Sequence, residues 1–408
     1  MIETRFKKTE IGEIPEEWEV KRMKDFATLI NGRAYKQEEL LNSGKYRVLR
    51  VGNFFSNESW YYSNLELNEN QYCNKGDLLY AWSCTYGAYL WNNSKTIYHY
   101  HIWKIIYKNI NKKFLYYLLN NDIEKQRKSS QGSTMSHITK GYMEMHFFSL
   151  PISLIEQQRI ATALSDIDTL LSTLTKKIEK KKLIKQGAMQ QLLTGKKRLA
   201  GFTDEWKCST IWEIASCNRT LFNDGDWIES PYITDNGYWL VQTGNIGTGF
   251  LKYGDSKKYI SHDSFLFLNC KKLLFNDILI CRLAEPAGRS CLYTSNSPAI
   301  TSVDVSIFRP DESIYNRLFL VYMMNTVNWL KSVSDKCGGS TRTRISRSEL
   351  GTIKIYIPST LEEQSAIATI LSDMDKEIEA LEAKRTKYTQ VKQGMMQQLL
   401  TGKIRLVD

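Results

Sequence analysis

Arginine side chains are concentrated in the stretch GSTRTRISR at residues 339–347, where Arg342, Arg344 and Arg347 lie beside small hydroxyl side chains. A guanidinium group can bind guanine through two hydrogen bonds or neutralise a phosphate. This composition predicts contact with DNA, with a solvated basic loop as the alternative. The first half of the chain has a less basic counterpart, GSTMSHITK at residues 132–140, for which DNA contact and an ordinary loop carry equal weight.

Further polar and aromatic side chains follow strand-like segments and are expected in loops that contact DNA. Asparagine and glutamine suit adenine, although Gly-Asn pairs are just as common in structural turns. The residues predicted to contact DNA form a broad set: Arg33, Tyr35, Lys36, Arg47, Arg50, Asn53, Ser133, Thr134, Ser136, His137, Lys140, Arg219, Gln242, Asn245, Arg282, Arg289, Ser340, Thr341, Arg342, Arg344 and Arg347.

The sequence contains no motif for binding a cofactor or for catalysis. TGNIGTG does not match the dinucleotide fingerprint, and the phosphate-binding loop pattern is absent. His99 and His101, expected on one face of a strand, could bind a metal, but no further ligand is evident and a structural role is expected. The prolines are isolated, so the Pro-Pro motif that holds a flipped base in amino-methyltransferases is missing. We therefore predict no catalytic, cofactor-binding or metal-binding residue in this chain.

Composition places the chain among ordinary globular proteins. Its 408 residues are 42% hydrophobic and 24% charged, enough for two to four domains. The apolar runs are too short to cross a membrane, and the N-terminus does not resemble a signal peptide, so a cytoplasmic location is expected. The eight scattered cysteines form no C-x-x-C pair and are expected to be buried free thiols. The net charge of +11 favours an anionic partner.

The chain contains a long internal repeat. MQQLLTGKKRL at Met189–Leu199 returns as MQQLLTGKIRL at Met396–Leu406, and the match extends back without a gap to Pro151 and Pro358. Each copy opens with a capping box, Ser153 with Glu156 and Thr360 with Glu363. Each copy then predicts a helix of about 40 residues and about 60 Å, ending near a glycine.

Apolar residues recur in these two helices at the alternating spacing of a coiled coil. Pairing the basic stretch of the first helix with the acidic start of the second favours an antiparallel arrangement, with Glu377 near Lys177 and Asp373 near Lys181. The residues predicted to pair the helices are Ile160, Leu164, Ile167, Leu171, Leu174, Ile178, Ile367, Leu371, Met374, Ile378 and Leu381.

The segments before the two helices also resemble each other, although weakly. EEWEVKRMKDFA corresponds to DEWKCSTIWEIA, and KGDLLY to FNDILI. We therefore predict an α+β protein with two similar globular domains, joined by two long helices that form an antiparallel intramolecular coiled coil with pseudo-two-fold symmetry. The predicted limits are residues 1–150 and 200–357 for the domains and 151–199 and 358–408 for the helical regions.

These motifs, taken in order over essentially the whole chain, resemble the specificity subunits of type I restriction–modification systems. The matching stretches are GEIPEEWEVKRMKDFA, GFTDEWK, LPISLIEQQRIATALSDID, IPSTLEEQSAIATILSDMD and both QQLLTGK helix ends. The resemblance implies two target-recognition domains that each read one half of a bipartite, asymmetric site on double-stranded DNA. It also implies a subunit without activity of its own.

The same resemblance implies two modification (methyltransferase) subunits and two restriction subunits as partners. S-adenosylmethionine, ATP and Mg would then belong to those partners and to adenine-N6 methylation and ATP-dependent cleavage, not to this chain. Two other classes are weighed against this interpretation. One is a self-contained enzyme that modifies or cuts DNA, and the other is a coiled-coil scaffold without DNA specificity.

Overall fold

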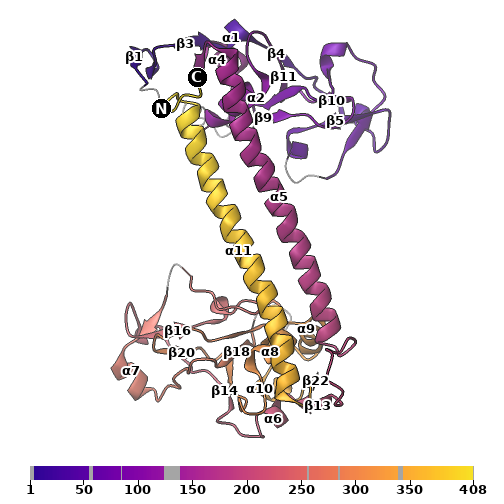
Figure 1. The fold of residues 1–408 in the computed structure, drawn as a ribbon. Coiled ribbons are helices and arrows are strands. Elements are labelled where there is room, and N and C mark those ends of the chain that lie inside the picture. The colour runs from indigo at the N-terminus through magenta and orange to yellow at the C-terminus, as the bar shows by residue number, and fades with distance from the viewer. Residues whose placement is uncertain are drawn as a thin grey trace. The chain divides into compact units, whose positions relative to one another are not determined.

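The protein divides into two compact units, one of residues 1–176 with 383–408 and one of residues 177–382 (Figure 1). Each unit contains one mixed α and β region and part of each long helix, α5 (Leu154–Leu192) and α11 (Leu361–Leu399). Within the described residues no helix could span a membrane. The computed structural model describes residues 4–54, 58–83, 85–123, 138–254, 257–283, 285–338 and 343–407.

Short β-branched and aromatic runs form the strands of the first unit. Two four-stranded sheets have the orders β6-β5-β10-β7 and β4-β11-β8-β9, and β12 pairs with β3 and β1 with β2. The elements are β1 (Phe6–Thr9), β2 (Gly12–Pro15), β3 (Trp18–Arg22), α1 (Met23–Phe26), β4 (Ala27–Asn31), β5 (Tyr46–Leu49), β6 (Tyr61–Ser63), β7 (Tyr72–Cys73), β8 (Leu78–Ala81), β9 (Gly87–Leu90), β10 (Thr96–Tyr98), β11 (Ile102–Tyr107), α2 (Lys112–Asn121), α4 (Lys140–Met145) and β12 (Phe147–Pro151).

The second unit is built in the same way. Its four-stranded sheets have the orders β14-β21-β18-β19 and β15-β17-β16-β20, and β13 pairs with β22. The elements are β13 (Lys207–Thr210), α6 (Ile211–Ile214), β14 (Phe222–Asp224), β15 (Ile233–Thr234), β16 (Tyr238–Val241), β17 (Tyr259–Ile260), α7 (His262–Phe267), β18 (Ile278–Cys281), β19 (Ser290–Leu292), β20 (Ala299–Thr301), β21 (Val305–Phe308), α8 (Arg317–Met323), α9 (Val327–Ser334), α10 (Arg347–Gly351) and β22 (Lys354–Ile357).

The two units share an unusual strand pairing. In each, one sheet contains a single parallel pair, β5 with β10 in the first unit and β16 with β20 in the second, while the other sheet is antiparallel. In each, a strand before the first short helix also pairs with the strand that leads into the long helix. The prediction of two similar α+β domains is confirmed.

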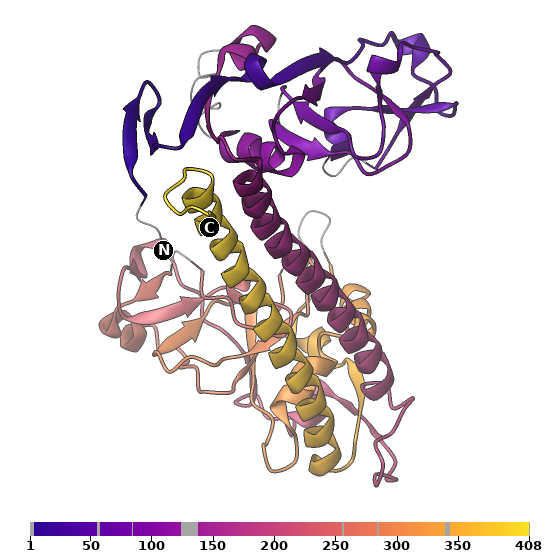
Figure 2. The same cartoon turned by 45° about the horizontal axis from the view of Figure 1, so that its top comes forward.

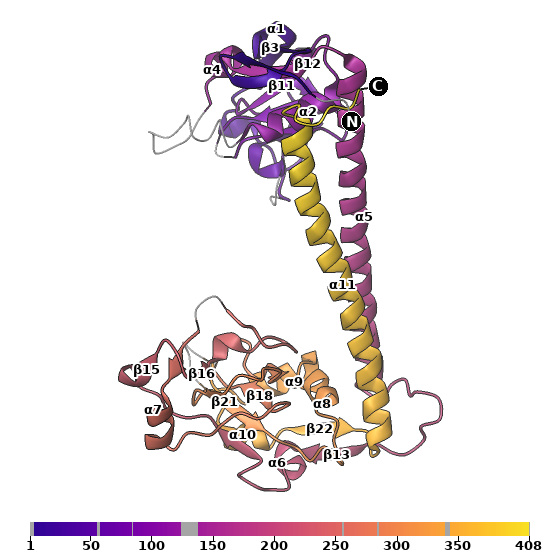
Figure 3. The same ribbon diagram turned by 60° about the vertical axis from the view of Figure 1, so that its left-hand side comes forward.

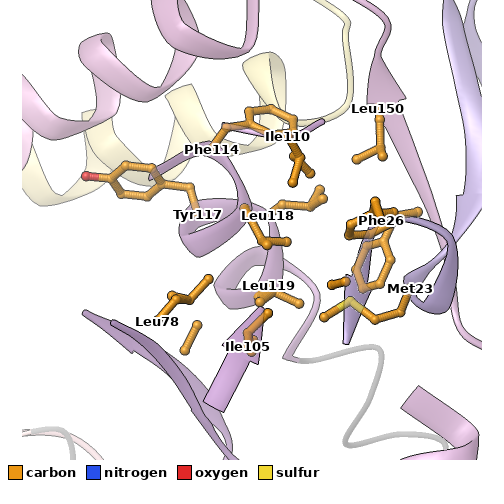
Figure 4. Close-up of a cluster of buried hydrophobic side chains, with 14 of the residues drawn as sticks. Met23, Phe26, Leu78, Ile105, Ile110, Phe114, Tyr117, Leu118, Leu119 and Leu150 are labelled. Atoms are coloured by element: carbon orange, nitrogen blue, oxygen red, sulfur yellow. The ribbon is translucent and has the colours of Figure 1, made fainter. Parts of the chain in front are cut away.

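Both long helices contribute to the cores of the units. In the first unit the start of α5 and the end of α11, through Leu399 and Leu400, pack into the cluster that contains Phe114 and Leu118 of α2 (Figure 4). The yellow end of α11 lies beside the start of α5 in Figure 2. In the second unit, Leu192 and Leu193 lie in the core with Ile367 at the start of α11. Figure 3 shows β22 and α8 near that end of α11.

The ends of the long helices follow the sequence signals. The Ser153 hydroxyl accepts a hydrogen bond from the Glu156 backbone N–H at 3.3 Å, and the Thr360 hydroxyl accepts one from that of Glu363 at 3.4 Å. Past the C-terminal ends, Gly195 and Gly402 have φ angles of 66° and 71°, a conformation that glycine adopts without strain.

The repeated peptide joins the start of one helix to the segment that follows the other. In the first unit Arg405 donates to both carboxylate oxygens of Glu156, at 2.5 and 2.7 Å. In the second unit Arg198 donates to both oxygens of Glu363, at 2.7 and 2.8 Å. Each capping-box glutamate is therefore bound by the arginine of the other copy, which gives the repetition of the peptide a physical reason.

Within each unit the two helices run antiparallel, as predicted. In the second unit Lys181, late in α5, pairs with Glu377, early in α11, at 2.7 Å. In the first unit Asp168, early in α5, pairs with Lys392, late in α11, at 2.6 Å. The expected pairings of Glu377 with Lys177 and of Asp373 with Lys181 were wrong by about one helical turn, because Lys181 pairs with Glu377 and Lys185 with Asp375.

The register is set by a tyrosine, an aspartate and a lysine that recur in both units. Asp168 accepts a hydrogen bond from Tyr117 of α2 at 2.7 Å as well as the ion pair from Lys392. Asp375 likewise accepts one from Tyr322 of α8 at 2.8 Å and pairs with Lys185. These contacts align the helices with the domains, which a charge count along the helices alone could not reveal.

The predicted helix-pairing residues divide into three groups. Ile160 and Leu164 lie in the core of the first unit, and Ile367 and Leu371 in the core of the second, so these four mainly anchor helices to domains. Ile167, Leu174, Ile178 and Ile378 are buried along the helices. Leu171, Met374 and Leu381 are only partly buried.

The cysteines depart in part from expectation. Among the described residues, Cys73, Cys270, Cys281 and Cys291 are buried and Cys337 is partly buried. Burial raises the pKa of the Cys73 and Cys291 thiols to about 12. Cys208 and Cys217 are exposed, so the prediction of burial was wrong for them.

Candidate DNA interface

In the second unit, Arg344 is the described arginine of the GSTRTRISR stretch that is most open to solvent. Its backbone exchanges hydrogen bonds with Gly338 at 3.0 and 3.1 Å. Its guanidinium pairs with Asp304 at 2.9 Å and its side chain remains 49% exposed. Arg344 is thus held in place while keeping surface for a ligand. Ser340, Thr341 and Arg342 lie outside the described residues.

Arg282 and Arg347 are used mainly within the fold. Arg282 is buried, donates to the carbonyl oxygens of Val303 and Ile345, and pairs with Asp224 at 3.2 Å. Burial lowers its pKa, although Asp224 opposes that effect. Arg347 lies 3.7 Å from Asp224 and over the Trp212 ring. These two arginines support the segment that carries Arg344.

Arg289 and the Gly-Asn turn form one structural element. The Arg289 guanidinium donates to the carbonyls of Ile246 at 2.7 Å and Thr243 at 3.0 Å. Asn245 accepts from the Gln242 N–H at 2.9 Å and donates to the Lys252 carbonyl at 3.1 Å. The side chains of Arg289 and Asn245 therefore shape the loop, which is the turn alternative raised by the sequence.

Asn53 has the same role in the first unit, and the arginines beside it are exposed. Asn53 accepts from the Arg50 N–H and donates to the Ser59 carbonyl, each at 3.0 Å. The Arg50 and Arg47 guanidinium groups lie over the rings of Tyr61 and Trp60, each 5.3 Å from the ring centre. Arg47 and Arg50 thus present charge at the surface in a fixed orientation.

Arg33, Tyr35 and Lys36 lie on the loop after β4. Arg33 makes a two-fold ion pair with Glu39 at 2.7 and 3.0 Å, and this hydrogen bonding raises the Arg33 pKa. Burial raises the pKa of Tyr35, whose hydroxyl contacts the Tyr98 carbonyl at 3.4 Å. Lys36 is exposed.

The remaining candidates are dispersed. Lys140 lies at the start of α4, 3.6 Å from Glu144, and Arg219 is exposed after α6. Ser133, Thr134, Ser136 and His137 lie outside the described residues.

Three side chains that the predicted set of DNA contacts does not name, Trp82, Tyr100 and His101, lie in the first unit where the arginine network lies in the second. The Trp82 N–H donates to the His101 carbonyl and its carbonyl accepts from Ile138. Arg282 makes the same two backbone contacts, with Asp304 and Ile345. Trp82 therefore corresponds to Arg282, and His101 to Asp304. The sequence does contain a signal for this correspondence, because Trp82 in YAWSC and Arg282 in CRLAE directly follow the equivalent strands β8 and β18.

The expected placement of His99 and His101 on a strand was wrong. Both lie at the turn between β10 and β11, with ring centres 4.9 Å apart. His99 accepts a hydrogen bond at Nδ1 from the His101 N–H at 3.5 Å. Burial, with further effects of His101 and Arg50, lowers the His99 pKa to about 4, so this imidazole is neutral at pH 7.

Comparison with solved structures defines the class of fold. The chain is similar to the type I restriction–modification S subunit from M. genitalium, with a TM-score of 0.58 and 16% identity over 94% of this chain and 96% of that one. A chain from a structural study of complex assembly and conformational transition of the type I R-M system gives a TM-score of 0.59 and 15% identity, covering 96% of this chain and 99% of that one. These likenesses show the fold.

Sequence comparison gives the family. The model for the type I restriction modification DNA specificity domain matches twice, at residues 15–185 and 204–390, and the chain belongs to this family. The MjaVIII specificity subunit of Methanocaldococcus jannaschii is 26% identical over 99% of this chain and 97% of its own length. The putative MjaX specificity subunit of the same organism is 25% identical with the same coverage.

Proposed function

We propose that this chain is the DNA-recognition subunit of a type I restriction–modification complex and reads a bipartite, asymmetric site with one domain per half-site. The observation that carries this proposal is the double match of one specificity-domain family to two units of the same construction. A reader with two identical domains would favour a palindromic site. Two domains with the same fold but different surface residues favour two half-sites of different sequence.

The partners follow from the repeat. Two helical regions with the same framework and closely matching ends offer two similar surfaces, which suits two copies of a modification subunit. Two restriction subunits would complete the assembly, in the cytoplasm. S-adenosylmethionine, ATP and Mg belong to those partners in this proposal, and the chain itself contributes recognition and no catalytic group. Native mass spectrometry of the reconstituted complex tests the expected two modification subunits per chain.

Single-molecule sequencing of genomic DNA tests the recognition proposal. Genomes from cells with and without this gene are compared for methylated adenine. We expect one bipartite motif with unlike halves that is methylated only when the gene is present. An unchanged set of methylated motifs would contradict the proposal, and modification of DNA by the purified chain alone would favour the self-contained enzyme instead.

A further inference from the structure

We infer that the first domain reads a thymine methyl group through an aromatic edge formed by Trp82, Tyr100 and His101, where the second domain presents Arg344. The inference rests on the proposed function and deepens it. It assigns recognition in the first domain to three side chains that the predicted set of DNA contacts does not include.

The position of this edge is defined by backbone contacts common to both domains. The backbone of Trp82 bonds to that of His101, in the turn before β11, and to that of Ile138. The backbone of Arg282 bonds in the same way to Asp304, in the turn before β21, and to Ile345. In the second domain the turn carries Asp304, which orients Arg344. In the first domain it carries Tyr100 and His101. The two domains thus carry different side chains at the equivalent position of the same fold. This is expected if their half-sites differ in sequence.

The aromatic edge is rigid. The Trp82 indole N–H donates to the Tyr100 carbonyl at 2.8 Å, which fixes the turn. Its ring stacks on Trp103 at 5.7 Å and meets the His101 ring edge to face at 5.0 Å. The Tyr100 ring lies 3.9 Å from that of His101 and remains 38% exposed. The turn therefore presents part of the Tyr100 ring at the surface.

The chemistry of this edge differs from that of Arg344. Arginine distinguishes guanine by donating to its acceptors, whereas apolar side chains distinguish thymine by packing against its methyl group. The indole N–H is already used within the turn, and the neighbouring His99 imidazole is neutral at pH 7. The ring carbons of Tyr100, a residue that is 38% exposed, can supply that apolar contact.

Replacing thymine by uracil tests this inference, because the change removes only the methyl group. The complex of the chain with its modification subunits is titrated with duplexes in which each thymine of the first-domain half-site is replaced in turn. One replacement should weaken wild-type binding by about four-fold, the contribution of one buried methyl group. The Tyr100→Ala complex should bind the thymine and uracil duplexes equally. His101→Ala should reduce the same preference.

Two comparisons keep the outcomes distinct. Ile106→Ala removes an exposed apolar side chain near the far end of β11 and should retain the wild-type thymine preference. Equal unfolding temperatures exclude misfolding of the variants. Wild-type binding without preference for the parental site would overturn the proposed function. A parental preference with no effect of uracil, or equal weakening of Tyr100→Ala on every duplex, would overturn the aromatic-edge inference alone.

Discussion

Removing Arg405 from the first unit should cost far more free energy of unfolding than removing an exposed lysine from the helix pair in the second unit. The Glu156 side chain is 1% exposed and that of Arg405 is 9% exposed. Arg405→Met therefore leaves the buried Glu156 carboxylate without the arginine of its ion pair, which costs about 3–5 kcal/mol of folding free energy. The Lys182–Glu382 pair is exposed at 58% and 37%, so Lys182→Met should cost at most about 1 kcal/mol.

Urea unfolding measures these free energies, and hydrogen–deuterium exchange of peptides from each unit shows where the loss occurs. Exchange should accelerate in β3 and at the start of α5 for Arg405→Met, and around β13 and the start of α11 for Arg198→Met, since Glu363 is equally buried. The double variant Arg405→Met with Glu156→Gln should recover much of the loss, because it removes the stranded charge. An Arg405→Met cost no larger than that of Lys182→Met would refute this reasoning.

Three further predictions concern recognition, pH and cofactor. Arg344→Ala should relax one base position of the second-domain half-site, at a cost of about 1–3 kcal/mol in binding; uniform weakening on all DNA with a shallower salt dependence would instead assign it to phosphate. The folded-state pKa of His99 is about 4, below the ordinary histidine value of 6.5, so its contribution to stability is present above pH 6.5 and is lost as pH falls towards 4. His99→Asn should flatten that part of the stability–pH curve, and parallel curves for both proteins would contradict the assignment. Calorimetry of the purified chain with S-adenosylmethionine should detect no binding, and micromolar affinity would show that a cofactor site was overlooked.

The elements that repeat in the sequence could be predicted well. The caps at Ser153 and Thr360, the glycine ends and the antiparallel direction all depend on local patterns or on a direct comparison of the two copies. The register was missed because it depends on Tyr117 and Tyr322, which reach the helices from the domains. The role of each repeated arginine was missed because its glutamate partner lies in the other copy.

The candidate DNA interface was harder to predict because residue type alone does not reveal burial. Arg282 and Arg289 have the side chains of DNA contacts, yet carbonyl groups from distant segments bind both. Conversely, the pairing of Ala81 with Ile102 brings Trp82 beside Tyr100 and His101. Such neighbours become visible only once the strand register is known. The other predicted DNA contacts, including the residues outside the described ranges, stay predictions.

Exchange of one domain tests the central claim most directly. Residues 1–150 are replaced by the corresponding domain of another family member, and methylated motifs are mapped by single-molecule sequencing in cells that contain the modification subunits. We predict that one half of the bipartite motif changes to that of the donor while the other half stays the same. A motif in which both halves change, or in which neither does, would contradict a reader with one domain per half-site.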